Sequence, residues 1–69
     1  MLKVNDEEKR FLVQNIENAE QSISTGDLNG VLLPLAEWIA VNGYDEKYQL
    51  MDIGREAERI YDSIYAKNI

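Results

Sequence analysis

The chain has 69 residues, a formal net charge of −6, and neither histidine nor cysteine. Without Cys there is no disulfide and no thiolate metal site, and without His the most common acid–base and zinc-binding side chain is missing. These exclusions favour a non-enzymatic protein with no metal and no cofactor. An apolar fraction of 45% and a charged fraction of 29% are typical of a globular chain, and the length fits one domain, residues 1–69.

We expect no targeting signal in the first residues. The sequence becomes acidic at Asp6 to Glu8, where a signal peptide needs its apolar stretch, and no apolar run approaches the roughly 20 residues of a membrane span. We therefore expect a cytoplasmic protein without membrane contact. A chain of this length buries only about 60% of its unfolded surface, so oligomerisation or partner binding is the natural source of extra stability.

The first predicted helix covers residues 6–24. Asn5 can cap the free amides of its first turn, and the three acidic residues that follow meet the positive end of the helix dipole. Apolar residues then recur at spacings of four, three and four, which places them on one face of the helix. They are Leu12, Ile16, Ala19 and Ile23. Val13 falls outside this stripe and is expected to be exposed.

The second predicted helix, residues 30–42, contains the longest apolar run, Val31 to Val41, whose only charge is Glu37. One side of this helix is expected to form the core and carries Val31, Leu32, Leu35, Trp38 and Ile39. Leu33, Ala40 and Val41 lie on the opposite side. Two flanking helices can hardly cover both sides, so this surplus of apolar surface predicts a partner-binding face. Gly43 is expected to end the helix in the left-handed conformation.

The third predicted helix covers residues 45–67. It is either continuous from Asp45 with a weak point at 50–54, or it starts afresh at Asp52. Its apolar stripe consists of Ile53, Ala57, Ile60 and Ile64, and three opposite-charge pairs are expected along its outer side. These are Arg55 with Glu58, Glu56 with Arg59, and Arg59 with Asp62. The predicted fold is a compact, all-α, three-helix bundle.

The charges are unevenly distributed along the chain. No Lys or Arg occurs from Phe11 to Glu46, a segment that holds six acidic residues. Binding to phosphate groups needs clustered Lys and Arg, so contact with nucleic acid or an anionic membrane is disfavoured. A basic protein surface is the more natural partner. The other interpretation, that the carboxylates only keep a small protein soluble, is left open by the sequence.

These patterns predict a protein that docks onto another protein, such as a small inhibitor, an immunity-type protein or a phage-encoded blocking protein. Acidic residues would attract a basic partner, and apolar or aromatic residues would hold it. The predicted acidic set is Glu17, Glu20, Asp27, Glu37, Asp45 and Glu46, and the predicted apolar set is Leu33, Val41, Tyr44 and Tyr48. A metal ion shared by Glu17 and Glu20 is the less favoured interpretation of that pair, because Mg²⁺ and Ca²⁺ take more oxygen ligands.

Two alternatives remain. The outer side of 31–41 can instead pack against a second copy in a symmetric dimer. In addition, the stretch Tyr48-Gln49-Leu50-Met51-Asp52-Ile53-Gly54-Arg55-Glu56-Ala57 resembles the segment that leaves the wing of winged helix-turn-helix repressors, where a Tyr-x-Leu-Thr-x-x-Gly-Arg-Glu pattern leads into a final helix. Met51 replaces the Thr of that pattern. This resemblance implies a transcriptional regulator with a vestigial winged fold, because the preceding part has no basic recognition helix and too few residues for the wing strands.

Overall fold

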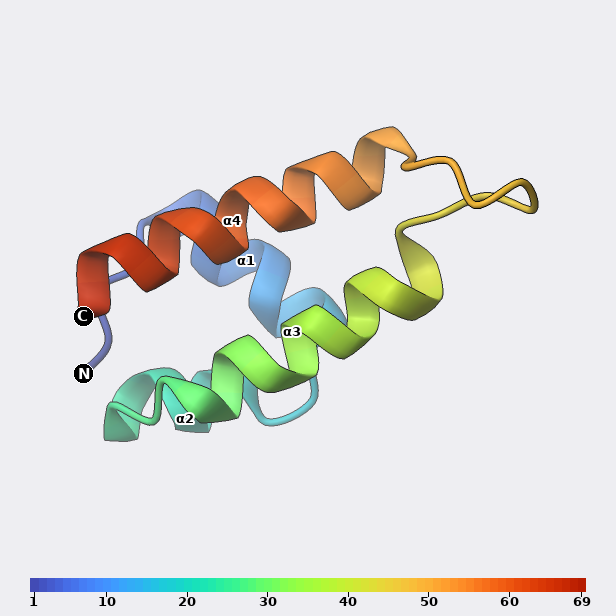
Figure 1. Cartoon of the computed structure of the whole chain (residues 1–69). Coiled ribbons are helices and arrows are strands. Elements are labelled where there is room, and N and C mark those ends of the chain that lie inside the picture. The colour runs from blue at the N-terminus through green and yellow to red at the C-terminus, as the bar shows by residue number, and fades with distance from the viewer.

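The computed structural model describes all 69 residues and shows a compact all-α fold with four helices: α1 (Asp6–Asn15), α2 (Ala19–Thr25), α3 (Asn29–Asn42) and α4 (Asp52–Asn68). α3 and α4 form a long helical hairpin, with α1 and α2 packed behind it (Figure 1). The connection between α3 and α4 projects at the end of the molecule opposite both chain termini. The all-α class is confirmed, whereas the predicted number of three helices is wrong.

The predicted start of the first helix is confirmed by a reciprocal capping box. The Asn5 side chain accepts a hydrogen bond from the Glu8 backbone amide at 2.7 Å, and the Glu8 carboxylate accepts one from the Asn5 amide at 3.0 Å. Two amides that have no partner inside the helix are thereby satisfied. The capping box also draws the Glu8 side chain back toward the N-terminal segment, where it becomes buried.

The predicted helix over 6–24 is two helices, because the backbone changes direction between Ile16 and Asn18. Ile16 is extended (φ −117°, ψ 124°), and Asn18 is left-handed with φ 62°. Asn is among the few residues other than Gly that adopt this conformation readily. The predicted apolar stripe is nevertheless buried on both sides of the break, and Val13 is exposed as expected. Periodicity therefore identified the inward-facing residues correctly and missed the break.

α3 buries one side and exposes the other, as the sequence predicted. Val31, Leu32, Leu35 and Ile39 are buried. Trp38 is half-buried, and its ring meets that of Phe11 edge to face at a centroid distance of 5.4 Å. On the opposite side, Leu33 retains 67% and Val41 72% of their accessible surface. Large apolar side chains of a helix that packs in a core are normally buried, and these two are not.

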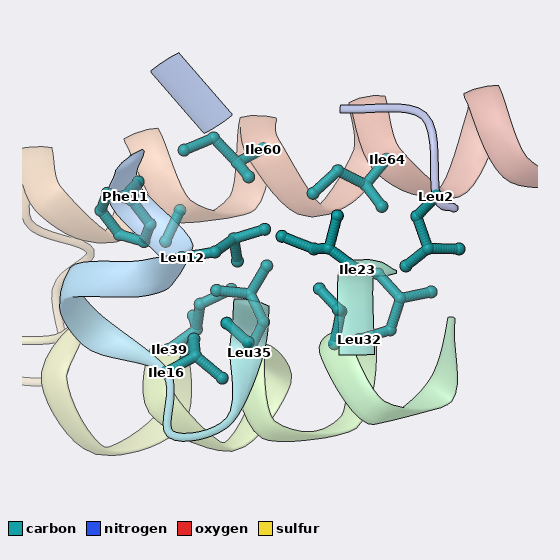
Figure 2. Packing of buried hydrophobic residues seen from close by; sticks show 13 residues of the cluster. Leu2, Phe11, Leu12, Ile16, Ile23, Leu32, Leu35, Ile39, Ile60 and Ile64 are labelled. Atoms are coloured by element: carbon teal, nitrogen blue, oxygen red, sulfur yellow. The ribbon is translucent and has the colours of Figure 1, made fainter. Parts of the chain in front are cut away.

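The core is a single cluster of thirteen buried apolar residues to which all four helices contribute (Figure 2). It also includes Leu2, which the sequence analysis did not assign to the core. The Leu2 amide donates to the Ile23 carbonyl at 2.9 Å, and Asn68 bonds both the amide and the carbonyl of Lys3. The N-terminal segment is thus attached to the ends of α2 and α4, and Leu2 lies near Ile23 and Ile64.

The third predicted helix begins afresh at Asp52, so the alternative of a continuous helix from Asp45 is wrong. Residues 44–50 form a loop, in which an isolated antiparallel bridge pairs Tyr44 with Leu50. No β-strand is present, in agreement with the expectation that the chain has too few residues for the strands of a wing. Asp52 is the first residue of α4 and makes no capping hydrogen bond.

Gly43 is not left-handed: its φ is −88°. Its function is close packing, because a Cβ at Gly43 would lie only 3.2 Å from the Cα of Gly54. The contact between Gly43 and Gly54 also shows that one residue of the predicted α4 stripe, Ile53, does not face the core. Gly54 faces α3, and the neighbouring Ile53 therefore turns outward and is 43% exposed.

Candidate functional site

The exposed side of α3 carries apolar residues around a single charged one. We name it the α3 outer face and define it by five exposed residues: Leu33, Ala36, Glu37, Ala40 and Val41. Leu33, Glu37 and Val41 follow one another at intervals of four residues and so form one row along the helix. The only charge in the face is the carboxylate of Glu37.

A hollow borders one side of this face, where α3 meets the end of α1. We name it the α1–α3 groove; its volume is about 250 Å³. The groove brings together three of the predicted partner-binding residues, Glu17, Glu37 and Val41, beside the half-buried ring of Trp38. Its other lining residues are Asn15, Ile16, Pro34 and Asn42. The two carboxylates are therefore close to an apolar floor, although they are 20 positions apart in sequence.

A second hollow borders the opposite side of the face, between α3 and α4. This α3–α4 groove has a volume of about 450 Å³ and is lined by Ala36, Ile39, Ala40, Tyr44, Glu58, Tyr61 and Asp62. Tyr44 was predicted to bind a partner. Glu58 and Asp62 were not, because the sequence places them among basic residues that were expected to neutralise them. The only sequence signal was their spacing of four residues, which puts both on one face of a helix.

The loop between α3 and α4 displays Tyr48. The Asp45 carboxylate accepts hydrogen bonds from the amides of Lys47 at 2.8 Å and Gln49 at 3.0 Å, and the Tyr48 amide donates to the Asp45 carbonyl. These bonds hold Tyr48 at φ 61° with 88% of its surface exposed. Asp45 therefore organises the loop, and Glu46 is exposed beside it.

Two predicted residues lie apart from this face. Glu20 lines a separate hollow on α2. Asp27 precedes α3, and its side chain accepts a hydrogen bond from the Gly30 amide at 3.0 Å, which is a turn-forming contact. α3 has 14 residues and is about 21 Å long at 1.5 Å per residue, so Asp27 and Tyr44 are separated by roughly the length of that helix.

The carboxylates around the α3 outer face have no salt-bridge partner. The structure contains two ion pairs, Arg59 with Glu7 at 3.8 Å and Lys67 with Glu8 at 2.5 Å, and both join α1 to α4. The three pairs predicted along α4 are not formed. Because Arg59 turns toward α1, Asp62 is left unneutralised, and no Lys or Arg lines either groove beside α3.

Glu8 is the one buried carboxylate, with 5% of its surface accessible. Burial alone raises the pKa of a carboxyl group, but hydrogen bonds from Lys67, Ser63 and the Asn5 amide act in the opposite direction and are stronger together. The pKa of Glu8 therefore lies below its ordinary value of 4.5. None of the surface hollows includes Glu8, and its contacts are those of a structural ion pair.

No group of three or more Asp and Glu side chains is arranged to hold a metal ion, and no helix combines the length and apolar character required to cross a bilayer. The features brought together by the fold are the α3 outer face, two acidic grooves along its sides, and the projecting loop with Tyr48. Comparison with protein-family models, with curated proteins and with solved structures finds no match to this chain.

Proposed function

We propose that this protein is a non-enzymatic binding protein that docks onto a basic surface of another protein through the α3 outer face, its two grooves and the projecting loop with Tyr48. The observation that carries the proposal is the combination of exposed Leu33 and Val41 with bordering carboxylates that have no salt-bridge partner. Such a protein blocks the surface it covers, which is how small inhibitors and immunity-type proteins act.

Apolar contact and charge have different parts in this proposal. Burying an exposed Leu or Val side chain contributes about 1.5 to 3 kcal/mol, so Leu33 and Val41 supply affinity. The carboxylates of Glu17, Glu58 and Asp62 lie at the margins, where charges mainly raise the association rate and select the partner. Glu37 lies within the face, between Leu33 and Val41. A basic partner would neutralise them, whereas a neutral or acidic partner would leave them desolvated without a counter-charge.

A symmetric homodimer is the second candidate, since the exposed apolar row on α3 also favours it. In such a dimer the same face is used twice, so Glu37 and the groove carboxylates of one copy would lie near those of the other. Like charges facing each other across an interface are unfavourable, and this favours the basic partner. Light scattering across a dilution series separates the two, because a dimer that persists on dilution supports self-association.

The charge dependence of binding tests the proposal. Immobilised protein is used to capture proteins from a lysate of the cells that encode it, at low and at moderate salt, with quantification by mass spectrometry. We expect the variant Glu17→Gln/Glu37→Gln to lose salt-sensitive basic proteins that the wild type retains. The control, Asp6→Asn/Glu56→Gln, removes the same charge from two residues that line a hollow between α1 and α4 and form no salt bridge. If both variants lose the same proteins to the same extent, capture depends only on the net charge of the protein, which contradicts docking at α3.

Tyr48 offers a test in which lost binding is not caused by unfolding. A residue other than Gly at φ 61° is strained by about 1 kcal/mol, and Gly relieves that strain while adding backbone entropy to the unfolded chain. Tyr48→Gly is therefore expected to leave the melting temperature nearly unchanged. With a captured partner its affinity should fall about tenfold or more, as expected when an aromatic anchor is lost.

Tyr65→Ala is the matched control for Tyr48→Gly. Tyr65 is an exposed aromatic residue on α4 that lies outside the loop between α3 and α4. Its removal should leave binding unchanged, as measured by calorimetry or surface plasmon resonance. If Tyr48→Gly binds as tightly as the wild type, the loop takes no part in docking.

A further inference from the structure

The α3–α4 groove has a composition that the α1–α3 groove lacks. Its floor is aliphatic and contains Ala36, Ile39 and Ala40, its aromatic residues are Tyr44 and Tyr61, and its charges are Glu58 and Asp62. Residues four apart on a helix have Cβ atoms about 5 to 6 Å apart, so the two carboxylates are neighbours on α4. Both are exposed, and neither forms a salt bridge.

We propose that this groove receives one arginine side chain of the basic partner; the inference rests on the function proposed above. The aliphatic stem of an arginine can lie on an apolar floor while its charged end remains at the rim. A guanidinium group has five N–H donors in a planar fork, which suits two neighbouring carboxylates. The tyrosine rings add a surface that attracts a cation.

Arginine fits the groove better than the other cations that two carboxylates could attract. A lysine ammonium is compact and strongly hydrated, and it cannot bridge two acceptors through a planar fork. A bare Ca²⁺ or Mg²⁺ ion takes six or more oxygen ligands, of which this groove supplies two carboxylates. A metal ion makes no use of the apolar floor, whereas a lysine stem can lie on it as an arginine stem can. The planar fork of donors is therefore what favours arginine over lysine at a rim with two carboxylates.

Binding also removes an unfavourable interaction in the free protein. Two like charges one helical turn apart repel each other, and the repulsion disappears when a cation lies between them. No Lys or Arg of the chain lines the groove, and neither Glu58 nor Asp62 forms a salt bridge. An arginine in the groove would therefore be supplied by another molecule.

The test is a nuclear magnetic resonance titration of the full-length, ¹⁵N-labelled protein with N-acetyl-arginine amide. We expect amide shift changes centred on α3 and α4 residues of the groove, with a dissociation constant in the range of about 1 to 10 mM, as for a ligand of this size. N-acetyl-citrulline amide has nearly the same shape without the charge and should cause no comparable shifts. Similar shifts with citrulline would overturn the proposal.

Two double variants test whether arginine binds in the α3–α4 groove. Glu58→Gln/Asp62→Asn should weaken arginine binding by about tenfold, because two charge-assisted hydrogen bonds are lost. The control Asp6→Asn/Glu56→Gln removes the same charge from residues outside both grooves and should bind arginine like the wild type. The spectrum of each free variant confirms its fold. Equal weakening in both variants would mean that arginine responds only to net charge, and the groove assignment would then be wrong.

Failure of this inference can be separated from failure of the proposed function. If a captured partner depends on Glu17 and Glu37 but binds Glu58→Gln/Asp62→Asn normally, docking at α3 holds and the arginine assignment is wrong. If arginine binds the groove selectively but no basic protein is captured through the α3 outer face, the groove assignment holds and the proposed function is wrong.

Discussion

Replacing Gly54 with alanine is expected to destabilise the protein by about 1 to 3 kcal/mol, the usual effect of adding an atom to a filled contact. A Cβ at residue 54 would overlap the carbonyl oxygen of Gly43. It would also lie 2.8 Å from the Gly43 Cα and 2.7 Å from a methyl group of Leu50. The first two atoms belong to the backbone, so α3 and α4 would have to separate where their ends meet.

Helix propensity alone predicts that Gly54→Ala stabilises the protein. Alanine inside a helix is more favourable than glycine by about 1 kcal/mol, and Gly54 is the third residue of α4. Thermal unfolding followed by circular dichroism at 222 nm decides between them, since 1 kcal/mol corresponds to a shift of about 4 to 8 °C in a domain of this size. We expect the melting temperature to fall. A variant that melts at or above the wild-type temperature would show that the two backbones are not in contact.

Gly30→Ala is a control in which the added Cβ is equally crowded, but by side-chain atoms and not by backbone atoms. A Cβ at residue 30 would lie 2.5 Å from a carboxylate oxygen of Asp27 and 2.7 Å from the Ser22 hydroxyl. Both neighbours are ends of side chains that can rotate away. The substitution should therefore be much less destabilising than Gly54→Ala, and the difference between them measures the cost of moving the α3–α4 junction.

The fold was predictable to the extent that hydrophobic spacing determines which residues face inward. The core side of α3 and the stripe through Ile16 and Ala19 were identified correctly. Spacing did not reveal that the chain turns at Asn18, because residues on either side of the turn remain in the order that a continuous helix would give. It also did not reveal the function of Gly54, since a glycine that weakens a helix and one that permits close packing look identical in sequence.

The candidate site was predictable only where it depends on one helix. The apolar surplus of α3 follows from its own residues, and Leu33 and Val41 are exposed as expected. The acidic rim of the α3–α4 groove depends on a contact between elements. Arg59 was expected to pair within α4, but it turns to Glu7 on α1, and charges that balance in the sequence are therefore separated in space.

Glu8 is expected to make the protein sensitive to acid, and Glu8→Gln should remove most of that sensitivity. A carboxyl group whose folded-state pKa lies below its unfolded value contributes stability that is fully present above the unfolded value and is lost as the pH falls through the folded-state pKa. For Glu8 the pKa is lowered from 4.5, so the loss begins as the pH falls below that value. At neutral pH the variant should be less stable by about 1.5 to 3 kcal/mol, the contribution of a hydrogen bond to a charged partner.

Urea unfolding from neutral pH down to about pH 3 measures both effects. Acid also protonates the exposed carboxylates and reduces the self-repulsion of a chain with a net charge of −6. This change is common to the wild type and the variant, so the difference between their unfolding free energies isolates Glu8.

The difference should be largest at neutral pH and should shrink as the pH falls below 4.5, the ordinary pKa of the group. Glu20→Gln, at an exposed carboxylate without a salt bridge, should show no such convergence. If Glu8→Gln and the wild type instead lose stability in parallel, the ion pair between Glu8 and Lys67 does not stabilise the folded state.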